Sequence, residues 1–118
     1  LWKSGNNEVI LDAYNANPSS MEAALMNLAS FENAYFILGD MFELGEYSSE
    51  EHFKIIQLSE RLELEGVFVG EQFASHPCKS FKNVEDLHRE LSLHPIRGKT
   101  ILLKGSRGMQ LEQLKGLL

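Results

Sequence analysis

The stretch Ala34-Tyr35-Phe36-Ile37-Leu38-Gly39-Asp40 contains five consecutive apolar or aromatic residues, followed by a glycine and an acid. A strand that lacks alternation between polar and apolar positions is typical of a parallel sheet whose two faces are both covered. We therefore predict that residues 34–38 form a strand that is buried on both faces.

Short apolar stretches alternate with amphipathic ones along the rest of the chain. We predict further strands at residues 8–11, 66–70, 80–81 and 100–104, and helices that begin at Asn17-Pro18, at Ser48 or Ser49, after Asn83 and at Met109. The turn cluster Ser4-Gly5-Asn6-Asn7 indicates that residues 1–3 pair antiparallel with residues 8–11. This order predicts one α/β domain over residues 1–118, a Rossmann-like three-layer fold whose mostly parallel sheet has an antiparallel edge strand.

The composition excludes several classes of function. The 118 residues carry a formal net charge of −6, which argues against binding a nucleic-acid polymer. The single cysteine, Cys78, cannot form an internal disulfide, so we expect a reducing cytoplasm. No apolar run approaches the roughly 20 residues that a membrane-spanning helix needs. We also expect a monomer. Because the chain begins with Leu1, we expect a domain of a longer protein.

The segment Asp12-Ala13-Tyr14-Asn15-Ala16-Asn17-Pro18 follows the strand at residues 8–11. In open α/β sheets, ligands bind beyond the carboxyl ends of the strands. There Asp12 could accept hydrogen bonds from ribose hydroxyls, and Tyr14 could cover a base. The alternative is structural: Tyr14 packs, Asn15 holds a turn and Asn17 only caps the next helix.

Two more segments leave strands at the same predicted edge. Leu38-Gly39-Asp40-Met41-Phe42-Glu43-Leu44-Gly45 is either a substrate wall or a solvated loop with an acid at each end. Lys104-Gly105-Ser106-Arg107-Gly108 combines two cations with two glycines before a predicted helix, which favours an anion site at the helix N-terminus. It does not match the GxxxxGK[ST] phosphate loop. The alternative is a basic turn that pairs with Asp40 or Glu43.

The remaining candidates are weaker. The predicted helix after Ser48 has an apolar face made by Phe53, Ile56, Leu58 and Leu62. His52 on this helix is interpreted as a solvated residue, with the alternative that it faces residues 40–45. The histidines do not have a metal-ligand spacing with Cys78, so no metal site is predicted.

The three segments, in this order, resemble the C-terminal domain of the Mur ligase family. The text that carries the resemblance is Asp12-Ala13-Tyr14-Asn15-Ala16-Asn17-Pro18-Ser19-Ser20-Met21, Leu38-Gly39-Asp40-Met41-Phe42-Glu43-Leu44-Gly45 and Leu103-Lys104-Gly105-Ser106-Arg107-Gly108-Met109. It is most similar to the family member that adds D-alanyl-D-alanine to UDP-N-acetylmuramoyl-tripeptide.

This resemblance implies an ATP-dependent amide ligase of bacterial peptidoglycan synthesis that works through an acyl phosphate. Family members have an N-terminal domain for the UDP-sugar peptide, a central domain that carries the ATP phosphate loop and Mg²⁺, and a C-terminal domain that closes over the site. This chain shows no phosphate loop, so we expect it to act as a lid domain and to be inactive alone.

The resemblance also implies a role for individual residues. Four residues are expected near the ribose and adenine of ATP: Asp12, Tyr14, Asn15 and Asn17. Five are expected near the incoming dipeptide: Asp40, Lys104, Gly105, Ser106 and Arg107. Two other interpretations stay open, a free-standing Rossmann-like module that binds a nucleotide or anion without catalysis, and a related amide ligase such as folylpolyglutamate synthase.

Overall fold

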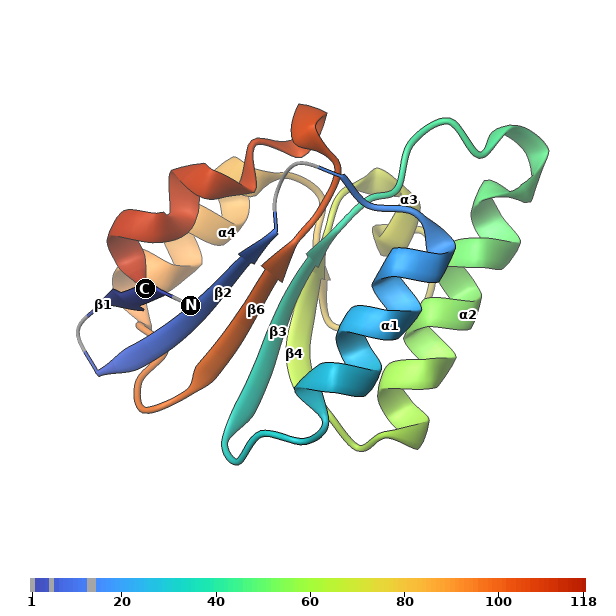
Figure 1. Cartoon of the computed structure of the whole chain (residues 1–118). Helices are drawn as coiled ribbons and strands as arrows, with labels where there is room; N and C mark the ends of the chain where they lie inside the picture. The colour runs from blue at the N-terminus through green and yellow to red at the C-terminus, as the bar shows by residue number, and fades with distance from the viewer. Residues whose placement is uncertain (1, 5, 13–14) are drawn as a thin grey trace.

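The computed structural model of this chain describes residues 2–4, 6–12 and 15–118. Six strands form one sheet in the order β1-β2-β6-β3-β4-β5 (Figure 1). The strands are β1 (Trp2–Ser4), β2 (Asn7–Asp12), β3 (Ala34–Gly39), β4 (Glu65–Val69), β5 (Ser80–Phe81) and β6 (Thr100–Lys104). The α-helices are α1 (Pro18–Leu28), α2 (Ser48–Arg61), α3 (Glu71–Ala74) and α4 (Val84–Leu93), and the 3-10 helices are η1 (Gly45–Tyr47), η2 (Arg107–Met109) and η3 (Leu111–Leu117).

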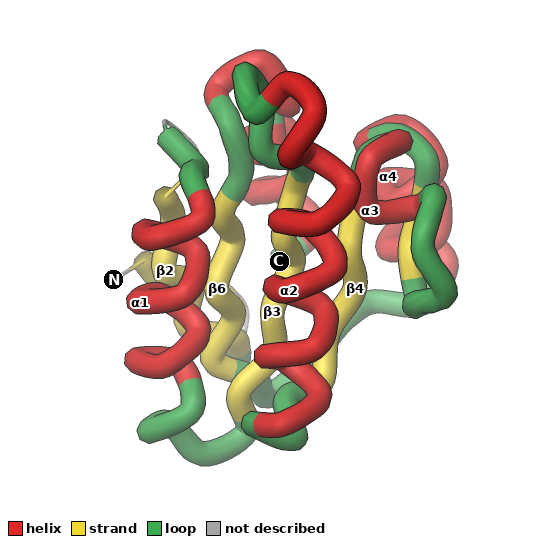
Figure 2. The backbone as a smooth tube through the Cα atoms, turned by 90° about the vertical axis from the view of Figure 1, so that its right-hand side faces the viewer, coloured by secondary structure: helices red, strands yellow, loops and turns green. Residues whose placement is uncertain are grey.

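Strands β2, β6, β3, β4 and β5 run parallel to one another. Strand β1 pairs antiparallel with β2 at one edge of the sheet. Helices α1, α2 and α3 cover one face, while α4 and η3 cover the other. Figure 2 shows α1 and α2 side by side across the first of these faces. The three-layer α/β fold with an antiparallel edge strand is therefore the fold that the sequence predicts.

The central strand β3 is buried on both faces, as its continuous apolar sequence predicts. Tyr35 and Ile37 belong to the core under α4 and η3. Phe36 and Leu38 belong to the core under α1, α2 and α3. Successive side chains of a strand point to opposite faces, so one uninterrupted apolar run fills both cores.

Local capping signals place the helices α1 and α4 correctly. The Asn17 side chain accepts a hydrogen bond from the Ser20 N–H at 2.9 Å, and the Ser20 hydroxyl accepts one from the Asn17 N–H at 3.1 Å. Asn83 accepts from the Asp86 N–H at 2.8 Å in the same way. Both asparagines thus satisfy N–H groups that a helix start leaves unpaired.

Two expectations about the helices were wrong. Phe53 is 43% exposed, and the core side of α2 includes the fully buried His52 instead. The chain after Met109 forms the 3-10 helix η3 and not an α-helix, and Gln110, with a left-handed φ of 54°, separates η3 from η2. The short helix α3 was not predicted.

Candidate functional site

The three motif segments meet at the carboxyl edge of the sheet. They follow β2, β6 and β3, which are adjacent parallel strands. Asp12 lies beside Lys104 in the register of β2 and β6, and Leu38 lies on the other side of Lys104. Segments that are far apart in the sequence therefore share the edge where open α/β sheets bind ligands.

Lys104 forms an ion pair with Asp12. The Lys104 Nζ lies 2.5 Å from Asp12 Oδ2 and donates a second hydrogen bond to the Asn15 carbonyl oxygen at 3.0 Å. The Lys104 side chain is 2% exposed, whereas that of Asp12 is 48% exposed. For Lys104 the carboxylate partner is thus Asp12, where the alternative of a basic turn expected Asp40 or Glu43.

The Gly105-Ser106 turn is fixed to both neighbouring strands. The Gly105 N–H donates to the Asp12 carbonyl oxygen at 3.3 Å, and the Ser106 N–H donates to the Asp40 carbonyl oxygen at 3.4 Å. The next helix is only the three-residue η2, so the α-helix N-terminus expected at this anion site was wrong. Arg107, the first residue of η2, is exposed, and the anion site at this turn stays a prediction.

Gly105 is required for close packing. A Cβ atom at Gly105 would lie 2.7 Å from Leu111 Cδ1 and 3.2 Å from Gly39 Cα. The ends of β3 and β6 thus approach each other at two glycines beneath Leu111. Gly105 is not among the glycines with positive φ, so its role is close packing and not a left-handed turn.

Asp40 is a buried residue that caps α3. Its Oδ2 accepts from the Gln72 N–H at 2.9 Å and its Oδ1 from the Phe73 N–H at 3.0 Å. Burial raises the pKa of the Asp40 carboxyl group, and the two backbone hydrogen bonds oppose that rise. Asp40 is 3% exposed and both of its carboxylate oxygens accept from N–H groups of α3, so Asp40 anchors α3 to the loop after β3.

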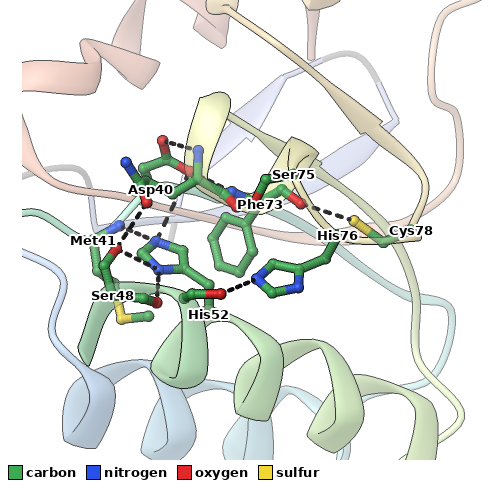
Figure 3. A network of polar contacts seen from close by, with 10 residues as sticks. Asp40, Met41, Ser48, His52, Phe73, Ser75, His76 and Cys78 are labelled. Atoms are coloured by element: carbon green, nitrogen blue, oxygen red, sulfur yellow. Dashed lines mark hydrogen bonds and ion pairs between the residues drawn. The ribbon is translucent and has the colours of Figure 1, made fainter. Parts of the chain in front are cut away.

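His52 is a neutral histidine buried beside Asp40 (Figure 3). Its Nε2 accepts from the Met41 N–H at 3.0 Å, so Nδ1 carries the proton and donates to the Ser48 carbonyl oxygen at 2.7 Å. Burial lowers the pKa of His52. The interpretation of His52 as solvated was therefore wrong, and the alternative that it faces the loop after β3 is confirmed.

A surface cavity of about 320 Å³ joins the three segments. It is lined by Asn15 and Ala16 from the first segment, Phe42 and Glu43 from the second, and residues 106–108 from the third. Of the other site residues expected from the sequence, Asn17 caps α1, and Tyr14 lies outside the described residues. The dipeptide and nucleotide contacts of these residues stay predictions.

A larger cavity, of about 690 Å³, lies between α1 and α2. Apart from Pro18, its lining contains none of the motif residues, and many of its side chains are charged. Lys54, one of them, pairs with Glu50 and Glu51 of its own helix. We therefore assign the candidate site to the smaller cavity, where the three segments converge.

The described residues contain no group of three His, Cys, Asp or Glu side chains that could hold a metal ion. Within the same part of the chain, no helix has the length and apolar character needed to cross a membrane.

Comparison with known proteins matches residues 2–107 to the family described as Mur ligase, glutamate ligase domain. The chain is 35% identical to the UDP-N-acetylmuramoyl-tripeptide–D-alanyl-D-alanine ligase of Treponema pallidum, over 92% of this chain and 27% of that protein. It thus spans about a quarter of the length of that relative.

Two solved structures have the same fold. The MurF ligase of Thermotoga maritima in complex with ADP superimposes with a TM-score of 0.75 and 25% identity, covering 98% of this chain and 30% of that one. The UDP-N-acetylmuramoylalanyl-D-glutamyl-2,6-diaminopimelate–D-alanyl-D-alanyl ligase of Acinetobacter baumannii gives a TM-score of 0.76 and 32% identity, covering 96% and 26%. The fold and the three convergent segments agree with these similarities. Because the family match covers residues 2–107, the chain belongs to the Mur ligase family as its glutamate ligase domain.

Proposed function

We propose that this chain is the C-terminal domain of a three-domain, ATP-dependent ligase that adds D-alanyl-D-alanine to UDP-N-acetylmuramoyl-tripeptide in bacterial peptidoglycan synthesis. The observation that carries the proposal is the similarity, over 92% of the chain, to the Treponema ligase of that specificity. The convergence of the three segments around one cavity supports it. The reaction class is that of acid–amino-acid ligases, and the enzyme is cytoplasmic and monomeric.

The two ligands would occupy neighbouring parts of the carboxyl edge. The half-exposed carboxylate of Asp12 is suited to accept hydrogen bonds from the ribose of ATP, with Asn15 beside it and Tyr14 in the adenosine neighbourhood. Arg107 and the Ser106 hydroxyl would hold the dipeptide carboxylate at the cavity wall. Gly105 supports this edge through close packing. Asp40 supports it by capping α3, and Asn17 by capping α1.

The residues of this chain would therefore bind and orient ligands and exclude water when the domain closes. The central domain would supply the phosphate loop and Mg²⁺. The isolated chain is expected to be inactive.

The deciding experiment measures ADP release by the full-length protein with UDP-N-acetylmuramoyl-tripeptide, ATP and Mg²⁺. We expect turnover only when D-alanyl-D-alanine is present, and none when L-alanyl-L-alanine or D-glutamate replaces it. ADP release that does not depend on the dipeptide, or that requires a different amine, would contradict the proposal.

The nucleotide half-site is tested with Asp12→Ala in the same protein. Loss of a hydrogen bond to a charged group costs about 1–3 kcal/mol, so the KM for ATP should rise by roughly 5- to 150-fold. The free energy of unfolding is measured in parallel, because this variant also removes the partner of Lys104. An unchanged KM for ATP in the folded variant would exclude Asp12 from the nucleotide half-site.

A further inference from the structure

Lys104 is a buried cation at the carboxyl end of β6, a strand in the interior of the sheet. Its side chain is 2% exposed. Lysine is almost never fully buried unless it is paired, because an ammonium group loses its hydration there. The three residues before it, Ile101, Leu102 and Leu103, continue an apolar strand, so the charge at position 104 departs from the pattern.

Among the described residues, the Lys104 ammonium group contacts the last residue of β2 and the segment that follows this strand. One contact is with the Asp12 carboxylate, at 2.5 Å, and the other is with the Asn15 carbonyl oxygen, at 3.0 Å. The two partners lie before and after residues 13–14 in the sequence. A single point charge with three donors thus holds the Asp12 carboxylate and the Asn15 carbonyl group together at the carboxyl end of β6.

A contribution to stability is a weak explanation for a buried ion pair at this position. Replacing a buried ion pair with apolar side chains of similar volume is often neutral or stabilising. Asp12 is 48% exposed and keeps part of its hydration, so the pair also loses some of its attraction to screening by water. What the lysine uniquely provides is the position of the Asp12 carboxylate and of the Asn15 backbone.

We propose that Lys104 is the positioning residue of the nucleotide half-site and takes no part in binding the dipeptide carboxylate. Its ammonium group orients the Asp12 carboxylate so that the exposed part of this group can receive a ribose, and it holds Asn15 beside it. The inference rests on the proposed function. It changes the role that the sequence motif indicates for Lys104, because the ammonium group points toward Asp12 and Asn15.

The test compares variants of the full-length ligase by their KM for ATP and for D-alanyl-D-alanine. In Lys104→Met we expect the KM for ATP to rise about 10-fold and the KM for the dipeptide to change less than 2-fold. Lys104→Gln keeps an amide NH₂ group as donor but loses the charge, and its KM for ATP should lie between those of Lys104→Met and the wild type. Lys99→Met is the matched control: it removes a partly exposed lysine that pairs with Glu65 at 3.0 Å near the opposite end of β6, and both constants should stay at wild-type values.

The proposal is overturned if the KM for the dipeptide rises as much as the KM for ATP, or more. It is also overturned if both KM values stay at those of the wild type. If Lys104→Met does not fold, Lys104→Gln decides by the same criterion: a selective rise in the KM for ATP supports the role, and unchanged constants overturn it. The proposed function is judged separately, by dipeptide-dependent ADP release in the wild type. If that activity is present and the Lys104 variants behave like the control, only the role of Lys104 is lost.

Discussion

His52 is the buried group whose replacement gives the sharpest test of this structure. We consider His52→Phe, which keeps an aromatic ring in contact with Phe73, whose ring centroid lies 4.5 Å from that of His52. The new ring cannot accept the hydrogen bond that Met41 N–H donates to His52 Nε2 at 3.0 Å. A buried N–H group without an acceptor costs about 1–3 kcal/mol, so the variant should lose that much free energy of unfolding at neutral pH.

The same substitution should remove a dependence of stability on pH. Burial lowers the pKa of His52 below 6.5, so the unfolded chain binds a proton more readily than the folded one. The contribution of neutral His52 to the free energy of unfolding is therefore complete above pH 6.5. It is lost as the pH falls toward the lowered pKa of His52. Within that window one such group changes the free energy of unfolding by up to about 1.4 kcal/mol per pH unit.

The assay is urea unfolding of this chain, followed by circular dichroism at pH 7.5 and at pH 5.5. The wild type should lose more stability than His52→Phe between the two pH values. His88→Phe, at an exposed position of α4, is the matched control, and it should keep both the stability at pH 7.5 and the wild-type slope. If the free energy of unfolding changes equally between the two pH values in His52→Phe and in the wild type, the assignment of His52 as a buried neutral group is refuted.

Three further variants test separate parts of the structure. Gly70→Ala should destabilise the fold by about 2–4 kcal/mol in urea titrations, because a Cβ atom at φ of 126° would lie 2.2 Å from Asp40 Cγ; wild-type stability would contradict the close approach. Asn7→Ala should cost about 2–4 kcal/mol in the same assay, since its buried amide group makes three hydrogen bonds of 2.8, 2.9 and 2.9 Å to backbone groups; a loss below 1 kcal/mol, roughly one hydrogen bond, would argue against that role. In the full-length ligase, Arg107→Ala should raise the KM for the dipeptide far more than the KM for ATP, whereas the exposed Arg89→Ala should alter neither; an unchanged dipeptide constant would remove Arg107 from that half-site.

Much of the candidate site could be placed from local sequence. The continuous apolar run of β3 predicts a strand covered on both faces, and Asn17 and Asn83 mark helix starts through bonds to residues three positions away. The strands then bring their trailing segments to one edge, because parallel strands end on the same side. These features depend on neighbours within about one helical turn or on the order of the elements, and both can be read from the chain.

The roles of individual polar side chains could not be predicted in this way. Asp40 looks like an acid in a solvated loop, but it caps α3, whose N–H groups lie 32 and 33 positions further along the chain. His52 follows two acidic residues in a helix that begins with serines, and nothing local indicates that it is fully buried.

The sequence by itself determined the α/β class, most strands and helices, and the three segments that define the family. Only the tertiary structure decided that Lys104 pairs with Asp12, 92 positions away, and that Gly105 serves a close contact with Gly39. The physical reason is that strand and helix formation follow from periodicity and capping over a few residues. The partner of a buried charge and the space around a Cα atom depend on which strands become neighbours, and that is set when β6 inserts between β2 and β3.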